Sequence, residues 1–295
     1  MSLTLARNEV PVPIALRLYL PKAWSTDRAR CDAAGVPEAI LFRTKWKIAL
    51  DEIERVRRAG VVFGDVLADA GYGACREFRE GLSAMGLTWA VGISPDQLVY
   101  ADDTTVEIPA STNHTGRPRT RGVPSTPPGK AREVVHALGR AAFHKVRWRR
   151  GTKGMLTASF AALRVRLADG PKVLGHRHGP GASVWLVCER RSGGETKFYV
   201  TNHPPDTPLQ RLASAIKARW SCEQAHQQLK EELGLDHFEG RSWNGLHRHA
   251  LLAMIAFAFL QHLRCTENKT AAQRSPAFPV VAGNPAPAGS TAGCA

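Results

Sequence analysis

The sequence lacks the features that mark secreted or zinc-binding proteins. Its six cysteines are scattered, with no C-x-x-C pair and no paired spacing, which argues against a zinc ribbon and a disulfide framework. They are typical of free thiols in a reducing cytoplasm, where we expect the protein. No charged N-terminal region precedes an apolar run and a small-residue cleavage site, so we expect no signal peptide. Walker, Rossmann and HExxH patterns are also missing.

Long hydrophobic runs are missing as well. The most apolar stretch, LLAMIAFAFL at 251–260, is half of the roughly 20 residues that a membrane span needs. We therefore expect a buried helix there and no membrane partner. The chain has no internal repeat. Its 295 residues, 43% of them hydrophobic, suffice for one large domain that carries an insertion.

Positive charge is what the sequence has in excess. The 40 Lys and Arg residues against 26 Asp and Glu give a net charge of +14. This surplus favours a polyanionic partner, because Lys and Arg that neutralise phosphates release counterions. The alternative is a generally basic soluble protein.

The surplus is concentrated between Arg117 and Lys153, where eleven Lys or Arg residues accompany one acid, Glu133. Within it, HKVRWRRGTKG at 144–154 interleaves a tryptophan with cations, which suits a phosphate backbone and a stacked base. A flexible soluble loop is the alternative. The candidate DNA-binding residues here are Arg147, Trp148, Arg149, Arg150 and Lys153.

The order of predicted elements is that of an α/β protein. The patterns predict a hairpin at 3–20, a helix at 43–58, a strand at 61–69, a helix at 75–84 and a strand at 88–93. Further strands are expected at 155–167, 183–190 and 197–201, and helices at 208–233 and 245–264. We divide the chain into a first core part (1–95), a β-rich basic insertion (96–206), a second core part (207–266) and a disordered tail (267–295).

Two acids are candidates for chemistry. Asp69 follows an apolar run and precedes a Gly-Tyr-Gly turn, so it is expected at the C-terminal end of a buried strand, where ligands bind in α/β sheets. Asp65 lies on the same strand, inside the run, and we favour Asp69. The alternative role for Asp69 is to cap the turn or helix that follows.

The second acid, Glu223, lies in KARWSCEQAHQQLKEELGL. Arg219, Glu223, His226 and Lys230 recur at steps of four, three and four, which places them on one helical stripe. A stripe of cations, an acid and an imidazole suits binding of a metal and phosphates. The alternative is a solvated face with an Arg219–Glu223 ion pair.

Both segments resemble those of bacterial insertion-sequence transposases of the DDE type. VLADAGYG, with EFREGL and WAVGI after it, is similar to the second-aspartate segment of that family. Arg219, Glu223 and Lys230 match its signature of Arg, three residues, acid, six residues, Lys. The Tyr that normally opens the signature is replaced by Ile216. RLYLPKAW at 17–24 is similar to the strand that follows the first aspartate.

The resemblance implies an RNase H-like fold, a mixed sheet flanked by helices, with a β-rich insertion before the third-acid helix. It also implies three acids that hold two Mg²⁺ or Mn²⁺ ions, of which Asp69 would be the second acid and Glu223 the third. Their carboxylates should then converge, with Arg219 and Lys230 flanking Glu223 where DNA lies. The implied partners are transposon ends, target DNA and a second copy in a synaptic complex.

The first acid of such a site is expected on a strand ahead of the hairpin at 3–20. Asp27 and Asp32 follow the hairpin, in a loop or short helix, and neither fits. We therefore expect a truncated transposase that is inactive alone. The rival hypothesis is a non-catalytic DNA-binding remnant that occupies transposon ends or interacts with intact transposase.

Overall fold

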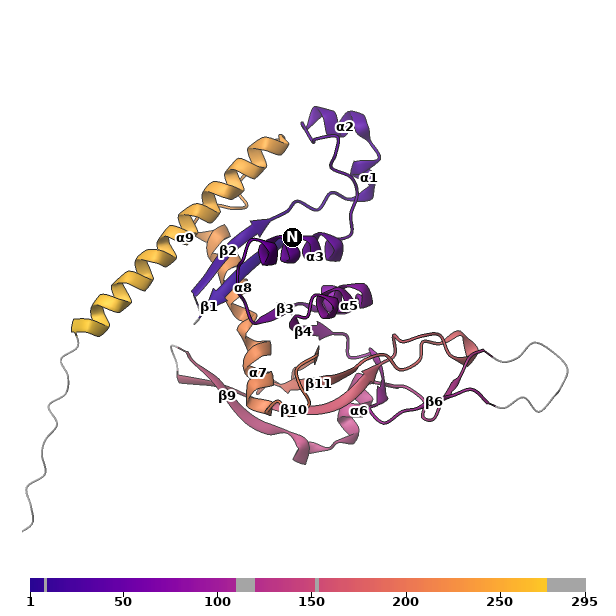
Figure 1. The fold of residues 1–295 in the computed structure, drawn as a ribbon. Helices are drawn as coiled ribbons and strands as arrows, with labels where there is room; N and C mark the ends of the chain where they lie inside the picture. The colour runs from indigo at the N-terminus through magenta and orange to yellow at the C-terminus, as the bar shows by residue number, and fades with distance from the viewer. Residues whose placement is uncertain (8–9, 110–119, 152–153, 275–295) are drawn as a thin grey trace, which may run out of the picture.

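The computed structural model describes residues 1–7, 10–109, 120–151 and 154–274, and Figure 1 shows their arrangement. The strands are β1 (Ser2–Arg7), β2 (Val10–Leu16), β3 (Asp65–Ala68), β4 (Thr88–Ile93), β5 (Leu98–Ala101), β6 (Val106–Glu107), β7 (Val123–Pro124), β8 (Gly129–Lys130), β9 (His144–Gly151), β10 (Gly154–Leu167), β11 (Ser183–Arg190) and β12 (Thr196–Thr201). The helices are α1 (Lys22–Ser25), α2 (Arg28–Ala33), α3 (Lys45–Arg58), α4 (Ala70–Gly73), α5 (Arg76–Ala84), α6 (Ala131–Ala137), α7 (Leu209–Ala218), α8 (Trp220–Glu231) and α9 (Trp243–Arg274). Two short 3₁₀ turns lie at Arg140–Ala142 and Leu174–His176.

Most of the described strands belong to one mixed sheet. Its order is β3-β4-β12-β11-β10-β5-β8, with β9 paired to the far end of the long strand β10. The pair β3–β4 is parallel and the others are antiparallel. The hairpin β1–β2 forms a separate two-stranded sheet. The expected α/β class, a mixed sheet flanked by helices as in RNase H-like proteins, is confirmed.

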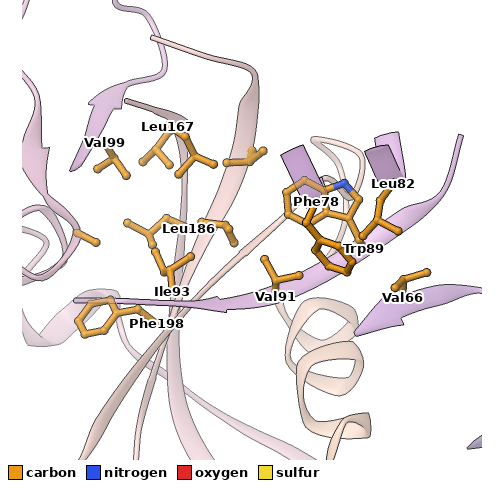
Figure 2. Close-up of a cluster of buried hydrophobic side chains, with 14 of the residues drawn as sticks. Val66, Phe78, Leu82, Trp89, Val91, Ile93, Val99, Leu167, Leu186 and Phe198 are labelled. Carbon is orange, nitrogen blue, oxygen red and sulfur yellow. The ribbon is translucent and has the colours of Figure 1, made fainter. Parts of the chain in front are cut away.

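The main core lies between this sheet and the helices α3 and α5. Alternation along β4 sends Trp89, Val91 and Ile93 to one face, where they meet Phe78 and Leu82 of α5 (Figure 2). Phe78 and Leu82 are almost fully buried, and each such side chain stabilises the fold by about 1.5–3 kcal/mol. Helix α7 covers the opposite face through Leu212, Ala213 and Ile216. Helices therefore flank both sides of the strands that lead to the site.

Several predicted elements need correction. The helix expected at 208–233 is two helices, because the regular hydrogen-bond pattern is interrupted at Arg219, whose N–H is directed to the Lys217 carbonyl. The strand expected from residue 61 begins only at Asp65, and the second hairpin strand ends at Leu16. Helix α9 continues to Arg274, past the expected end of the ordered chain at residue 266, and 275–295 lie outside the described residues.

The expectation that 251–260 forms a buried helix is confirmed for the helix and wrong for its burial. The segment is helical, but Leu251, Leu252, Ile255 and Phe259 are 56–68% exposed. Helix α9 packs against β2 and α8 with one side, and the apolar residues on its other side have no neighbour in the described part of the chain. By length and composition Trp243–Thr266 would suffice to cross a membrane, and 22% of the most apolar window is buried. A single helix of this kind is weak evidence for a span.

Candidate acid site and nucleic-acid interface

Asp69 lies directly after β3, at the expected C-terminal end of a strand. Its backbone is extended, and its Oδ1 accepts hydrogen bonds from the N–H groups of Gly71 (2.9 Å) and Tyr72 (3.2 Å), which caps the short helix α4. The capping role is therefore real, and it occupies one carboxylate oxygen. Within the described part of the chain, Oδ2 accepts no hydrogen bond. The cap thus fixes the carboxylate and leaves one oxygen for a ligand.

Two glycines let α4 lie directly on β4 and so position Asp69. A Cβ at Gly73 would overlap the carbonyl oxygen of Gly92, and one at Gly92 would meet Ala70 N at 3.0 Å. We expect Gly73→Ala to lower the free energy of unfolding by about 1–3 kcal/mol, because a rigid backbone cannot move aside. Urea denaturation followed by circular dichroism measures this.

The matched control is Gly64→Ala, four residues before Ala68, where an added Cβ meets nothing within 4 Å. It should change the free energy of unfolding by less than about 0.5 kcal/mol. Equal stability of the two variants would show that α4 does not press on β4.

Asp65 is held in a structural ion pair. Arg211 of α7 donates to its Oδ2 at 2.6 Å, and His203 lies beside it. Burial alone would raise the pKa of Asp65, but His203 and Arg211 together hold that pKa below its ordinary value. Its carboxylate is thus used to join β3 to α7, which supports the choice of Asp69 as the acid for chemistry.

Glu223 lies in the first turn of α8, where the positive end of the helix dipole favours a carboxylate. Arg219, at the junction with α7, forms the expected ion pair with it through Oε1. The whole predicted stripe lines one cavity of about 730 Å³, together with Asp69. This acid cavity is lined by Met1, Ser2, Leu3, Ala49, Ile53, Val66, Leu67, Ala68, Asp69, Tyr72, Phe78, Arg219, Cys222, Glu223, His226, Gln227, Lys230, Glu231 and Asp236. Residues 154 positions apart in the sequence therefore face the same space.

His226 makes a contact that sequence patterns do not reveal. Its Nε2 hydrogen-bonds the hydroxyl of Ser2 on β1. Burial lowers the pKa of His226, and the nearby charges of Lys230 and the N-terminus lower it further. The ring is therefore neutral over a wider pH range than a free histidine and can act as an acceptor or a ligand. No motif points to Ser2, because the two residues lie 224 positions apart.

Asp69 and Glu223 fit part of a divalent-metal site. Each offers a carboxylate, the ligand that Mg²⁺ and Mn²⁺ prefer, with one oxygen engaged by a hydrogen bond. Among the described residues, however, no group of three or more His, Cys, Asp or Glu side chains is placed to hold a metal ion. Glu231 and Asp236 also line the acid cavity, but within the described part of the chain they are not grouped with Asp69 and Glu223 as a metal site.

A second cavity adjoins the first and is strongly cationic. Its volume is about 300 Å³, and Arg219 and Glu223 line both cavities. This cationic cavity is lined by Ala6, Trp148, Arg149, Leu156, Arg191, Lys197, Tyr199, Ser214, Ile216, Lys217, Ala218, Arg219, Trp220, Ser221 and Glu223. It holds five Lys or Arg residues and one acid, so its charge suits a phosphate backbone that leads toward Glu223.

The structure distributes the predicted DNA-binding residues unevenly. Arg147 is exposed on β9, and the Arg149 guanidinium lies 3.7 Å from the ring centroid of Trp220 in the cationic cavity. Trp148 packs edge-on against Phe160, with ring centroids 5.9 Å apart. Its ring is therefore part of the hydrophobic core. The side chain of Arg150 and all of Lys153 lie outside the described residues.

Comparison with known proteins identifies the family of the chain. A family model described as DDE superfamily endonuclease matches residues 1–155, which include Asp69 and exclude Glu223. No curated protein matches the chain. Since the family match covers more than half of the 295 residues, the chain belongs to the DDE superfamily endonucleases.

Proposed function

We propose that the protein is the transposase of a bacterial insertion sequence, which cleaves and joins DNA strands with Asp69 and Glu223 as two of its three acids. The family acts on DNA and uses divalent metal ions. The observation that carries the proposal is the acid cavity, where the end of β3 and the first turn of α8 bring these carboxylates to one space. Its continuity with the cationic cavity gives DNA a path to them.

Each residue has a distinct role in this proposal. Asp69, fixed by its cap on α4, and Glu223, held by Arg219, present carboxylate oxygens to Mg²⁺ or Mn²⁺. Bound divalent ions would supply charge stabilisation at the reacting phosphate and an activated oxygen nucleophile. Arg219 and Lys230 bind the phosphates that flank the scissile bond. Arg147, Arg149, Arg150 and Lys153, with Trp148 beside them, hold the duplex farther out.

The wider organisation is part of the same proposal. Residues 1–95 and 207–274, which include all of α9, form the catalytic core, and 96–206 form the basic insertion. We propose that the protein works in the cytoplasm on nucleoid DNA, as a homodimer in a synaptic complex with transposon ends and target.

We expect no strand cleavage or joining by this chain alone with Mg²⁺ or Mn²⁺. Two carboxylates hold an ion loosely, and among the described residues no group of three or more His, Cys, Asp or Glu side chains is placed to hold a metal ion. We do expect weak Mn²⁺ binding that is lost in the double variant Asp69→Asn/Glu223→Gln. Electron paramagnetic resonance of Mn²⁺ measures the binding, and nicking of supercoiled plasmid measures the cleavage.

The matched control is Asp206→Asn/Glu239→Gln, which removes two exposed acids outside the acid cavity and the same charge. It should leave Mn²⁺ binding unchanged. If both double variants bind Mn²⁺ alike, neither Asp69 nor Glu223 is a metal ligand. A nick that disappears in Glu223→Ala would show that another acid, Asp27 or Asp32 first, completes the site.

A second candidate function is supported by the described residues, among which no three His, Cys, Asp or Glu side chains are grouped to hold a metal ion. In that case the chain is a non-catalytic DNA-binding protein that occupies transposon ends or interacts with intact transposase. Specific binding to a terminal repeat by the Asp69→Asn/Glu223→Gln variant, equal to that of the unmodified chain, would favour it.

A further inference from the structure

Helix α9 carries an apolar stripe that the fold does not cover. Leu252, Ile255, Phe259 and Leu263 recur at steps of three, four and four, so at 100° per residue they share an arc of about 80°. All four are exposed, and Leu251 is exposed beside them. We call these five residues the α9 stripe. The opposite side of the helix packs against β2 and α8, and Figure 1 shows α9 along one side of the molecule. A contiguous exposed apolar surface of this kind marks an interaction site.

The length of the α9 stripe makes a lipid bilayer a poor occupant. From Leu251 to Leu263 the helix rises about 18 Å, whereas the hydrocarbon core of a bilayer is about 30 Å thick. His262 and Arg264 are exposed at the C-terminal end of the stripe, and the other side of the helix is covered by folded protein. A bilayer would have to admit both polar side chains, which is costly. A polypeptide surface fits the stripe better.

The pattern of the stripe is symmetric about its middle, which favours a second copy of the same chain. When two copies of α9 run antiparallel, Leu252 of each lies opposite Leu263 of the other, and Ile255 lies opposite Phe259. An isologous two-fold interface requires a surface that matches itself in this way. Most soluble oligomers are symmetric assemblies of one chain. The α9 stripe therefore meets the requirement of a homodimer surface.

Charge favours the antiparallel direction over the parallel one. A parallel pair in register would set Arg248 and Arg264 against the same residues of the other copy, and like charges repel. In the antiparallel pair Arg248 lies opposite Thr266, and Arg264 lies opposite Leu251. Antiparallel helices also place dipole ends of opposite sign side by side. The antiparallel pair thus separates the cations at both ends of the stripe.

Pairing through α9 would leave the acid cavity open. Ala225 and Leu229 of α8 pack against α9, whereas Glu223 and Lys230 of α8 line the acid cavity. These two pairs lie on opposite faces of α8, because Ala225 is two positions from Glu223 and Leu229 is six. Helix α8 therefore stands between the α9 stripe and the acids. Each copy in a pair would keep its own cavity free for DNA.

We propose that two copies of this chain pair antiparallel through the α9 stripe. One pair of helices packed over about 18 Å belongs to the small interfaces, below about 1,200 Å² in total, so the dimer dissociates in the micromolar range. The pairing stands on the surface of α9 alone, whereas its use in holding two DNA ends together rests on the proposed function.

The test is sedimentation velocity of the full chain between about 1 and 100 μM, where we expect the sedimentation coefficient to rise with concentration. Leu252→Glu and Leu263→Lys should each weaken dimerisation by about tenfold or more, because each sets an unpaired charge against a leucine. An equimolar mixture of the two variants should dimerise within about threefold of the unmodified chain, since the new glutamate then lies opposite the new lysine. Only the antiparallel register predicts this rescue.

The matched control makes the same changes at Leu41 and Val62, exposed apolar residues in the loops before and after α3. Leu41→Glu and Val62→Lys, alone or mixed, should leave dimerisation unchanged. All four variants should keep the circular dichroism spectrum of the unmodified chain, because the changed side chains are exposed. A mixture of the α9 variants that dimerises no better than either alone overturns the antiparallel pairing. A chain that stays monomeric overturns it too, and binding of that monomer to phosphatidylglycerol vesicles would assign the stripe to a membrane.

Mn²⁺ binding separates this proposal from the proposed function. Leu252→Glu should bind Mn²⁺ as the unmodified chain does, because α8 stands between the stripe and the acids. Dimerisation with the predicted rescue, but with Mn²⁺ binding that does not depend on Asp69 and Glu223, supports the pairing and refutes the acid site. Mn²⁺ binding that depends on both acids, in a chain that never dimerises, supports the acid site and overturns the pairing.

Discussion

The affinity of this chain for duplex DNA should fall by roughly 10³ or more between 50 and 200 mM salt, if six or more phosphates are neutralised. The basis is the net charge of +14, the eleven cations between Arg117 and Lys153, and the cationic cavity. Each phosphate contact releases counterions, so the logarithm of the binding constant falls linearly with the logarithm of salt concentration. Fluorescence anisotropy with two unrelated duplexes measures the slope.

Reversal of Arg147, Arg149 and Arg150 to Glu should weaken binding to all sequences about equally and reduce the slope by about one per lost contact. A matched control carries the same charge change on α3, at Lys47, Arg57 and Arg58, which are exposed. This control should retain most of the affinity. If the variant with the three reversed charges on β9 keeps both its affinity for DNA and the slope of its salt dependence, the predicted insertion is not the DNA-binding surface.

The largest single effect on stability is expected at the buried acid Glu189. This side chain is 1% exposed on β11, and Lys217 of α7 donates to it at 2.7 Å. Arg191 and the Tyr199 hydroxyl also contact it, each at 3.2 Å. Burial alone would raise the pKa of Glu189, but Lys217 and Arg191 hold it below its ordinary value of 4.5. The carboxylate is therefore charged in the folded state and depends on its partners.

We expect Lys217→Met to lower the free energy of unfolding at pH 7 by about 3 kcal/mol, because a buried charge loses its closest partner. The double variant Glu189→Met/Lys217→Met should recover most of this loss, since two apolar side chains replace the pair. Urea denaturation gives both values. A double variant as unstable as the sum of the single changes would show that the two side chains act independently.

The pH dependence gives a further check with a defined sign. Because the folded-state pKa of Glu189 is depressed, its contribution is present in full above pH 4.5 and is lost as pH falls through the folded-state value. The difference in unfolding free energy between the unmodified chain and Lys217→Met should therefore narrow below pH 4.5. A difference that stays constant down to pH 3 would exclude the ion pair as its cause.

Local patterns predicted most of the elements, because periodicity and turn residues act over a few positions. The helix at 45–58 and the strands at 88–93 and 183–190 agree with the predicted bounds within two residues. The break at Arg219 was missed, since no proline or glycine marks it and the residue keeps helical angles. The exposure of Leu252 and Phe259 was missed because apolar composition does not say whether a neighbour exists on that side.

The same distinction between local patterns and long-range packing applies to the candidate site. Asp69 was predictable because it ends a strand, and the stripe of Glu223 was predictable from helical spacing. The contact between Ser2 and His226 and the lining of the cationic cavity both bring together residues far apart in sequence. Such contacts are set by how the sheet and helices pack, and one sequence holds no local sign of them.

The junction of β4 with β12 limits how this protein can be dissected or recombined. Residues 90–93 of β4 are hydrogen-bonded antiparallel to residues 198–201 of β12, so the predicted insertion (96–206) continues the backbone ladder of the predicted core. Excision of 96–206 would strip β4 of the neighbour that covers one edge and leave its peptide groups without acceptors. Transplanting the insertion between relatives therefore requires a compatible β12 register, and deletion libraries should return soluble products only where both strands are kept together.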